Sequence, residues 1–164
     1  MRKLIVLGLV LLALWAMGRL PFHAADVAEL LPVRTVLVDR EGNKVSVDAG
    51  IGVRGIGDTL SEALASLRER ASGRIFFGTA EQVILTDRAV DLLPEALDEP
   101  SFRPAAGVYL TTERDLDPDA AADYLSTHSS NLTLIRLKAL REQGEEVTLP
   151  VLRRVGGGFC VSPE

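Results

Sequence analysis

Residues 73–110 read GRIFFGTAEQVILTDRAVDLLPEALDEPSFRPAAGVYL, and the strands and helices that this segment predicts form the centre of the domain. Two apolar runs, residues 74–77 and 83–85, are rich in β-branched and aromatic side chains, which favour strands. A short helical segment, a turn bounded by prolines and a third strand-like run at 108–112 follow them. Strands that alternate with helical segments predict a layered α/β core.

Residues 59–71 predict an amphipathic helix that leads into this core. Apolar side chains recur at the i, i+3, i+4, i+7 spacing, so one face of the helix packs on a sheet. The helix begins with the sequence TLSE, a capping box in which the Thr59 hydroxyl and the Glu62 carboxylate satisfy backbone N–H groups. The dipeptide Ser72-Gly73 ends it.

After the second strand, Thr86 or Asp87 can cap a helix that continues to Leu93. Pro94 cannot sit inside that helix without the loss of a hydrogen bond, so we expect it to start a second short turn.

Two further segments predict a β-hairpin before the core. Residues 33–39 and 44–49 alternate apolar and polar side chains about the turn sequence EGN. With the core, they predict an α/β (α+β) domain that has a mixed β-sheet of about five strands packed by three to four helices. An N-terminal hydrophobic helix precedes this domain.

The C-terminal third predicts a closing layer. Residues 131–143 indicate a helix whose wide apolar surface implies burial on more than one side. Residues 146–153 indicate a strand interrupted by Pro150, which suits an edge strand or a bulge. A glycine turn then leads to a returning strand at residues 159–162.

The N-terminus carries a targeting segment. Fifteen uncharged, mostly apolar residues at 4–18 follow Arg2 and Lys3, as in the hydrophobic region of a secretory signal, and fall slightly short of the roughly 17–25 residues that span a bilayer. A cleaved signal and a retained anchor both stay open, and a buried core helix is disfavoured because no face is polar. We expect residues 1–22 to be a signal peptide or membrane anchor, and 23–164 a single extracytoplasmic α/β domain at the cell membrane.

The domain after this segment is acidic. Three of the 18 basic residues precede residue 20 and no acidic residue precedes Asp26, so 15 basic and 23 acidic residues remain, a net charge of −8. This balance argues against nucleic acid as a partner and against docking on anionic lipid. The single cysteine, Cys160, cannot form an internal disulfide.

Two motifs imitate ligand sites. Residues 50–55, GIGVRG, match the dinucleotide fingerprint, but that motif needs a helix that opens within its glycines, and here the helix starts at residue 59. A flexible or bulged linker is the preferred interpretation. Residues 115–119 resemble the start of a calcium loop that then lacks its glycine and its glutamate, so Asp117 as a helix N-cap before Pro118 explains the acidic cluster better.

The residues that usually carry chemistry do not form a recognisable pattern. His23, His128 and Cys160 lack metal-ligand spacing, and Cys160 in a C-terminal strand is more typical of a small apolar packing residue than of a nucleophile paired with histidine. Asn131 fits a glycosylation sequon, although a helix N-cap is the preferred role. The sequence therefore predicts no catalytic, cofactor-binding or metal-binding residues, no cofactor, and a binding or assembly role rather than an enzyme.

An ordered series of segments, rather than one motif, carries a family resemblance. In chain order the segments are VLVD at 36–39, TLSEA at 59–63, IFFG at 75–78, VIL at 83–85, DRA at 87–89 and EVTLP at 146–150. The series resembles the N-terminal domain of the Ger(x)C spore germination proteins, the C subunits of nutrient germinant receptors. It covers roughly residues 30–160. The chain has Thr79 where the family usually shows a histidine, lacks a lipobox cysteine, and is shorter than we expect of the family.

This resemblance implies a non-catalytic, membrane-associated accessory or assembly protein in spore germination or sporulation. Its partners would be the membrane, through the N-terminal hydrophobic segment, and germinant-receptor or other spore membrane proteins. The family has no established enzymatic activity, which agrees with the residue survey. The alternative is an extracytoplasmic small-ligand-binding domain of an unrelated pathway.

Overall fold

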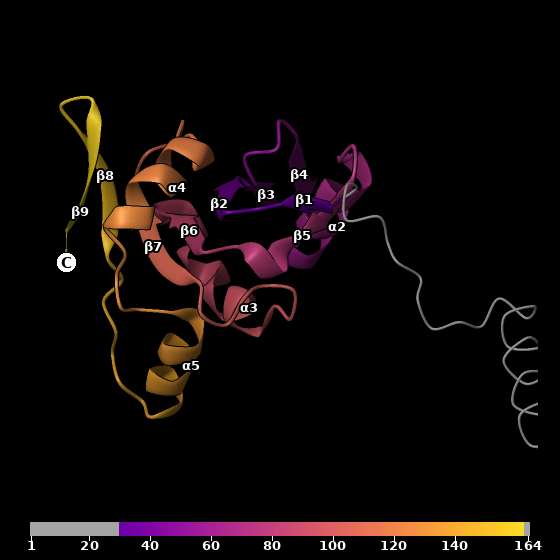
Figure 1. Cartoon of the computed structure of the whole chain (residues 1–164). Helices are drawn as coiled ribbons and strands as arrows, with labels where there is room; N and C mark the ends of the chain where they lie inside the picture. The colour runs from indigo at the N-terminus through magenta and orange to yellow at the C-terminus, as the bar shows by residue number, and fades with distance from the viewer. Residues whose placement is uncertain (1–29, 163–164) are drawn as a thin grey trace, which may run out of the picture.

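The computed structural model describes residues 30–162 of the chain (Figure 1). Its centre is a seven-stranded sheet, the main sheet, with the strand order β4-β3-β2-β6-β7-β8-β9. The strands are β2 (Thr35–Glu41), β3 (Lys44–Asp48), β4 (Arg54–Gly57), β6 (Gln82–Thr86), β7 (Gly107–Thr111), β8 (Val151–Val155) and β9 (Gly158–Ser162). The predicted signal peptide or anchor at 1–22 lies outside the described residues.

The main sheet is mixed. β2, β6, β7 and β8 are parallel, while β3 and β4 extend one side and β9 the other in antiparallel pairing. The predicted fold class, an α/β (α+β) domain with a mixed sheet packed by helices, is confirmed. The sheet has seven strands where the sequence predicts about five.

The sequence does not predict β4, because the glycine-rich residues 50–55 indicate a flexible or bulged linker and the strand begins at Arg54. Gly50 and Gly52 adopt positive φ and turn the chain, but Gly55 and Gly57 lie in the strand. A Cβ on Gly55 would lie 2.6 Å from Leu67 Cβ, and one on Gly57 would lie 2.5 Å from the Ala63 nitrogen. These two glycines therefore let the strand approach the next helix more closely than any side chain would allow.

A small second sheet holds the predicted strand at 74–77. β5 (Arg74–Phe76) pairs in parallel with β1 (Leu30–Pro32) and not with the main sheet. Ile75 is buried whereas Phe76 is 48% exposed, so only one face of this sheet meets the core. The chain then makes a 3-10 turn, η2 (Phe77–Thr79), before it enters β6.

Helices cover both faces of the main sheet. They are α2 (Leu60–Arg70), α3 (Leu93–Asp98), α4 (Pro118–Thr127) and α5 (Leu134–Glu142), with a 3-10 helix, η3 (Asp87–Leu92). Since side chains alternate along a strand, Val36, Val83 and Val108 pack with α2, α3 and α5 on one face. Leu37, Ile84 and Tyr109 point to the other face, the α4 face, where they pack with Leu125 of α4.

The predicted caps at Thr59 and Asp117 start helices, and the cap predicted at Asn131 does not. Thr59 caps α2 as predicted, since its hydroxyl accepts from the Glu62 N–H at 3.2 Å, but the Glu62 carboxylate accepts from the N–H of the preceding residue, Asp58, at 2.8 Å. Asp117 caps α4 as predicted. The predicted helix at 131–143 starts later, at Leu134, because Thr133 rather than Asn131 caps it and accepts from the Arg136 N–H at 3.4 Å.

Two other predicted elements differ in the structure. The helix expected after Thr86 is the 3-10 helix η3, and the Thr86 hydroxyl bonds to a neighbouring strand instead of capping it. The strand expected at 146–153 begins only at Val151, just after Pro150, which cannot donate to a ladder. Within residues 30–162, no helix has the length and apolar character needed to cross a membrane.

The close approach of β4 and α2 gives a test of the packing. Gly55→Ala should lower the free energy of unfolding by about 1–3 kcal/mol, because the new methyl group overpacks the contact with Leu67. Gly158→Ala is the matched control, since only a carbonyl oxygen at 3.9 Å would meet its Cβ. Urea denaturation of both variants measures the difference, and equal stability of the two would contradict the packing argument.

Candidate functional site

The β8–β9 hairpin is the first of two surface features that could serve a partner. Gly156 and Gly157 join its strands with φ values of 58° and 89°, as a two-residue turn with positive φ at both positions requires. The hairpin extends at one side of the molecule, past the end of α4 (Figure 1). Among the described residues β9 pairs only with β8, so its outer edge, the β9 edge, is open.

The backbone geometry of the hairpin determines which groups face outward. In a two-residue hairpin the pair that flanks the turn, here Val155 and Gly158, exchanges hydrogen bonds, and bonded and non-bonded pairs then alternate. This alternation directs the backbone N–H and C=O groups of Phe159 and Val161 away from β8. The β9 edge therefore offers these groups to another strand.

Aromatic and basic side chains surround the β9 edge. The Phe159 ring lies 5.9 Å from the Tyr124 ring, which stacks on His128 at 4.2 Å. The Arg154 guanidinium lies over Phe159, 5.7 Å from the ring centroid. Val155, next to the turn, is 61% exposed. Residues 151–162 contain two arginines and no acidic residue, so the hairpin is basic although the domain is acidic.

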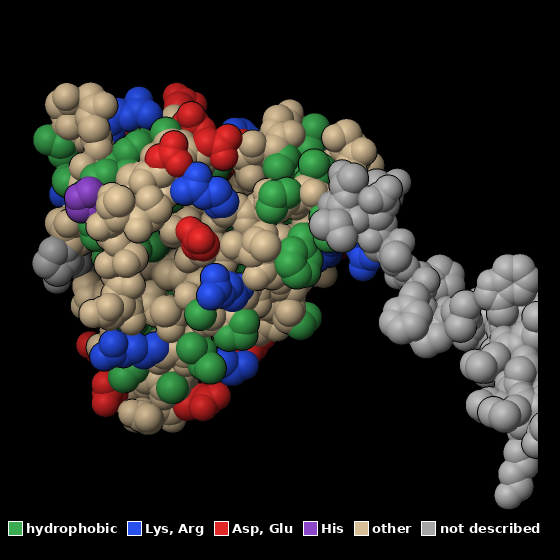
Figure 2. All heavy atoms as spheres, in the orientation of Figure 1, with side chains coloured by type: hydrophobic (Ala, Val, Ile, Leu, Met, Phe, Trp, Pro, Cys, Tyr) green, Lys and Arg blue, Asp and Glu red, His purple; other side chains and the backbone are tan. Residues whose placement is uncertain are grey.

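Charges elsewhere on the surface are mixed. Figure 2 shows acidic and basic side chains interspersed over the visible face, with no large region of one sign. Several of them pair across elements. The Arg34 guanidinium lies 2.7 Å from Asp123, and this hydrogen bond raises the pKa of Arg34 and ties α4 to the start of β2. Lys138 and Asp98 lie 2.6 Å apart, and their hydrogen bond raises the pKa of Lys138 and lowers that of Asp98.

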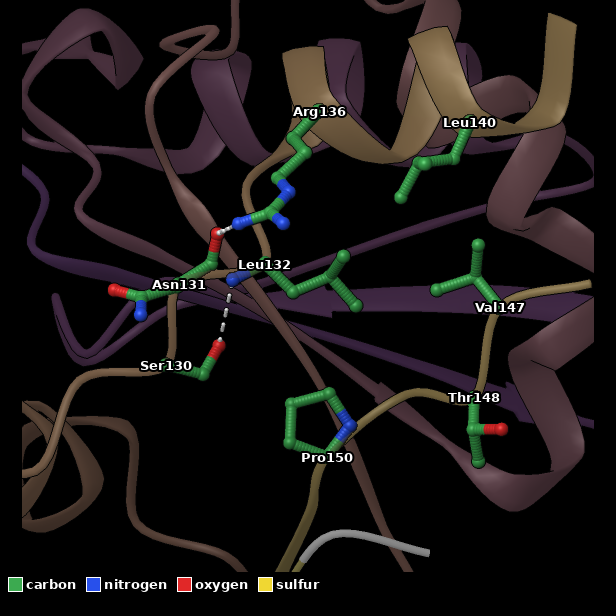
Figure 3. Close-up of a pocket in the computed structure, with 8 residues that line it drawn as sticks. All are labelled: Ser130, Asn131, Leu132, Arg136, Leu140, Val147, Thr148 and Pro150. Atoms are coloured by element: carbon green, nitrogen blue, oxygen red, sulfur yellow. Dashed lines mark hydrogen bonds between the residues drawn. The ribbon is translucent and has the colours of Figure 1, made fainter. Parts of the chain in front are cut away.

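The second feature is a cavity of about 410 Å³ beside α5, the α5 cavity. The side chains of Leu132, Leu140 and Val147 converge on it, and Pro150 closes one side (Figure 3). Arg136 lies at its rim and donates to the Asn131 carbonyl at 3.4 Å. The α5 cavity thus combines an apolar wall with one guanidinium, an arrangement that suits a small ligand with an apolar body and an acceptor group.

The carboxyl ends of parallel strands are where α/β sheets commonly bind ligands, and at the ends of β2 and β6 the polar side chains bond to one another. Asp39 at the end of β2 accepts from the Thr86 hydroxyl at 2.5 Å, from Arg88 at 2.7 Å and from the Arg40 N–H at 2.8 Å. This arrangement, the Asp39 brace, joins β2, β6 and η3. Because the carboxylate oxygens are occupied by internal donors, the brace is a structural feature.

The Asp39 brace should be measurable as stability. Asp39→Ala should lower the free energy of unfolding by about 2 kcal/mol or more, because it leaves the buried Thr86 hydroxyl and the Arg88 guanidinium without their acceptor. Asp91→Ala, which breaks the exposed ion pair with Arg40, is the control and should cost much less. If urea denaturation gave similar losses of unfolding free energy for both variants, the Asp39 brace would contribute no more to stability than an exposed ion pair.

The residues weighed in the sequence have mainly structural surroundings. Cys160 is half-buried on β9 and makes no hydrogen bond with His128, whose Nδ1 lies 3.0 Å from the Tyr124 carbonyl oxygen. The Thr79 hydroxyl accepts from the Val33 N–H at 3.1 Å and so ties η2 to the start of β2. Among residues 30–162 no group of three or more His, Cys, Asp or Glu side chains could hold a metal ion.

The sequence predicted β9 as a strand but did not predict either surface feature. The one signal for the β9 edge is that the strand sequence, GFCVS, contains no charged residue and no proline. The lining of the α5 cavity comes from α5 and from two loops, which no local pattern connects. Comparisons with protein-family models, with curated proteins and with solved structures found no match for this chain.

Proposed function

We propose that this protein is a non-catalytic, membrane-associated accessory or assembly protein in spore germination or sporulation, and that it binds its partner through the β9 edge. The order of segments that resembles germinant receptor C subunits motivates the choice of process. The observation that carries the assembly role is an edge strand that has an open backbone edge and none of the usual protective side chains.

The unpaired backbone groups of an edge strand can pair with another chain, and proteins usually prevent this with lysine, proline, a bulge or a covering helix. β9 has neither lysine nor proline, and its partly buried Phe159 and Val161 present an apolar surface beside the edge. The opposite edge strand, β4, reads RGIG and is held against α2. The difference between the two edges supports β9 as the one that receives a partner strand.

Strand addition gives affinity through main-chain hydrogen bonds and specificity through the flanking side chains. Here the flanking side chains are Arg153 and Arg154 on β8 and the aromatic rings of Phe159 and Tyr124. We therefore expect the partner to be an extended segment of another spore membrane protein that carries acidic residues near an apolar strand. β1 lies on the far side of the molecule from β9 (Figure 1), so an anchor that precedes β1 would leave the hairpin free to reach this partner.

Genetics and fractionation test the process. In a spore-forming source strain the protein should sediment with membranes of sporulating cells, and a deletion should reduce spore yield or nutrient-triggered germination. Normal spore yield together with normal germination in the deletion strain would end this proposal.

Two substitutions at one position test the β9 edge itself. Val161→Pro removes the outward N–H without touching a bond to β8, whereas Val161→Thr keeps that N–H in a side chain of similar shape. Complementation of the deletion strain should succeed with Val161→Thr and fail with Val161→Pro, while both purified proteins keep a cooperative thermal transition. Full complementation by Val161→Pro would exclude strand addition as the mode of assembly.

The α5 cavity favours a second candidate function, small-ligand binding in an unrelated extracytoplasmic pathway. Its volume and its apolar wall with Arg136 at the rim are the observations that support this candidate. In this case the domain would act as a receptor for a small amphipathic molecule, and the hairpin would not be required.

Thermal-shift screening of the full-length protein tests this candidate. A true ligand at about 100 times its Kd stabilises the folded state by about 2.7 kcal/mol and raises Tm accordingly. Leu140→Trp, which fills the α5 cavity, should abolish the shift, and Ala139→Trp on the exposed part of the same helix should retain it. A shift that survives Leu140→Trp would place the ligand elsewhere.

A further inference from the structure

A smaller cavity of about 260 Å³ opens at the amino ends of β6 and β7, on the α4 face. We call it the Gln82 cavity. Gln82 and Tyr109 lie in its wall, and serine side chains from the end of α4 and the following loop line the other side. Glu81 and Arg103 are exposed residues of its lining. It shares only Ser130 with the α5 cavity.

Gln82 is only 4% exposed, yet half of its amide is unpaired. Its Oε1 accepts from the Thr35 hydroxyl at 2.9 Å. Within residues 30–162 the Nε2 has no hydrogen-bond partner. Gln82 Nε2 is not one of the fully buried atoms that lack a partner, so its two N–H donors face the open cavity, where water or a ligand can accept from them.

Tyr109 brings a second donor to the same wall. Its side chain is fully buried, and its hydroxyl oxygen accepts from the Ser130 N–H at 2.7 Å, which leaves the hydroxyl hydrogen free to donate. Gly107 lets the Tyr109 ring lie close to the backbone of β7, since a Cβ there would lie 3.0 Å from Tyr109 Cε2 and 3.3 Å from the hydroxyl oxygen. Donors from two adjacent strands thus meet at one cavity.

We propose that the Gln82 cavity binds a small carboxylate. A carboxylate offers about four acceptor sites, so it can accept from Gln82 Nε2, from the Tyr109 hydroxyl and from serine hydroxyls together, while Arg103 supplies an opposite charge. The Glu81 carboxylate at the mouth repels an anion and attracts an ammonium group, so it sets the preference between a simple carboxylate and an amino acid. This site does not involve the β9 edge. It lies at a different cavity from the α5 cavity, and it names a class of ligand, carboxylates, for a small-ligand-binding function.

Titration calorimetry of the full-length protein with propionate, alanine and glycerol tests the proposal. Propionate or alanine should bind, and glycerol, a neutral polyol, should not. Tyr109→Phe, which removes one hydroxyl and keeps the ring, should weaken the bound carboxylate by about tenfold. Gln82→Leu should weaken it at least as much, and Gln143→Leu on the surface should leave it unchanged.

The outcomes separate the possible occupants. Loss of alanine binding in Glu81→Gln identifies an ammonium partner, and stronger propionate binding in that variant identifies a simple carboxylate; both support the site. Absence of binding by both carboxylates, or glycerol binding as tightly as they do, overturns the proposal in favour of water as the occupant. Tm measurements confirm that each variant is folded. Leu140→Trp at the α5 cavity and Val161→Pro at the β9 edge should leave carboxylate affinity unchanged. A failure of the carboxylate proposal is therefore distinct from a failure of either function proposed above.

Discussion

β6 lies between two parallel neighbours, β2 and β7, and all five of its residues are buried. A strand enclosed in this way must satisfy its polar side chains from adjacent strands, since water cannot reach them. Gln82 at its start is met by Thr35, and Thr86 at its end is met by Asp39. Alternation along the strand puts both residues on the α4 face with Ile84 between them, so the burial of one strand determines where polar groups gather on that face.

The two ends of β6 are completed differently. At the carboxyl end each oxygen of the Asp39 carboxylate accepts from internal donors, and the brace joins β2 to η3. At the amino end the amide of Gln82 is satisfied on one side only. The polar groups at the carboxyl ends of β2 and β6 are therefore bonded internally, whereas at the amino end of β6 the Gln82 Nε2 has no partner among residues 30–162. The β9 edge lies three strands away from β6 in the main sheet and is a separate surface, which offers mainly backbone N–H and C=O groups.

Local signals predicted the parts of the fold that are local in origin. The hairpin of β2 and β3 follows from alternation about a turn, and α2 follows from a capping box and an apolar stripe. β4 was missed because its glycines argue against a strand, although close packing on Ala63 and Leu67 requires them. Nothing in the sequence near Gln82 indicates a cavity, because Thr35 and Ser130 are 47 and 48 residues away from it. The parallel pairing of β2 with β6 brings Thr35 to Gln82, and the loop after α4 brings Ser130 to the same cavity.

The attachment of the β8–β9 hairpin has a consequence for how the domain opens. Its two strands pair with each other along their full length, but β8 pairs with β7 only at Leu110–Val151 and Thr111–Leu152. Such a unit can detach as one piece while β2, β6 and β7 remain paired, and its amides should exchange with solvent sooner than those of the central strands. A partner strand bound at β9 would have to separate together with the hairpin before the amides could exchange. Binding of a partner would therefore slow amide hydrogen exchange throughout the hairpin.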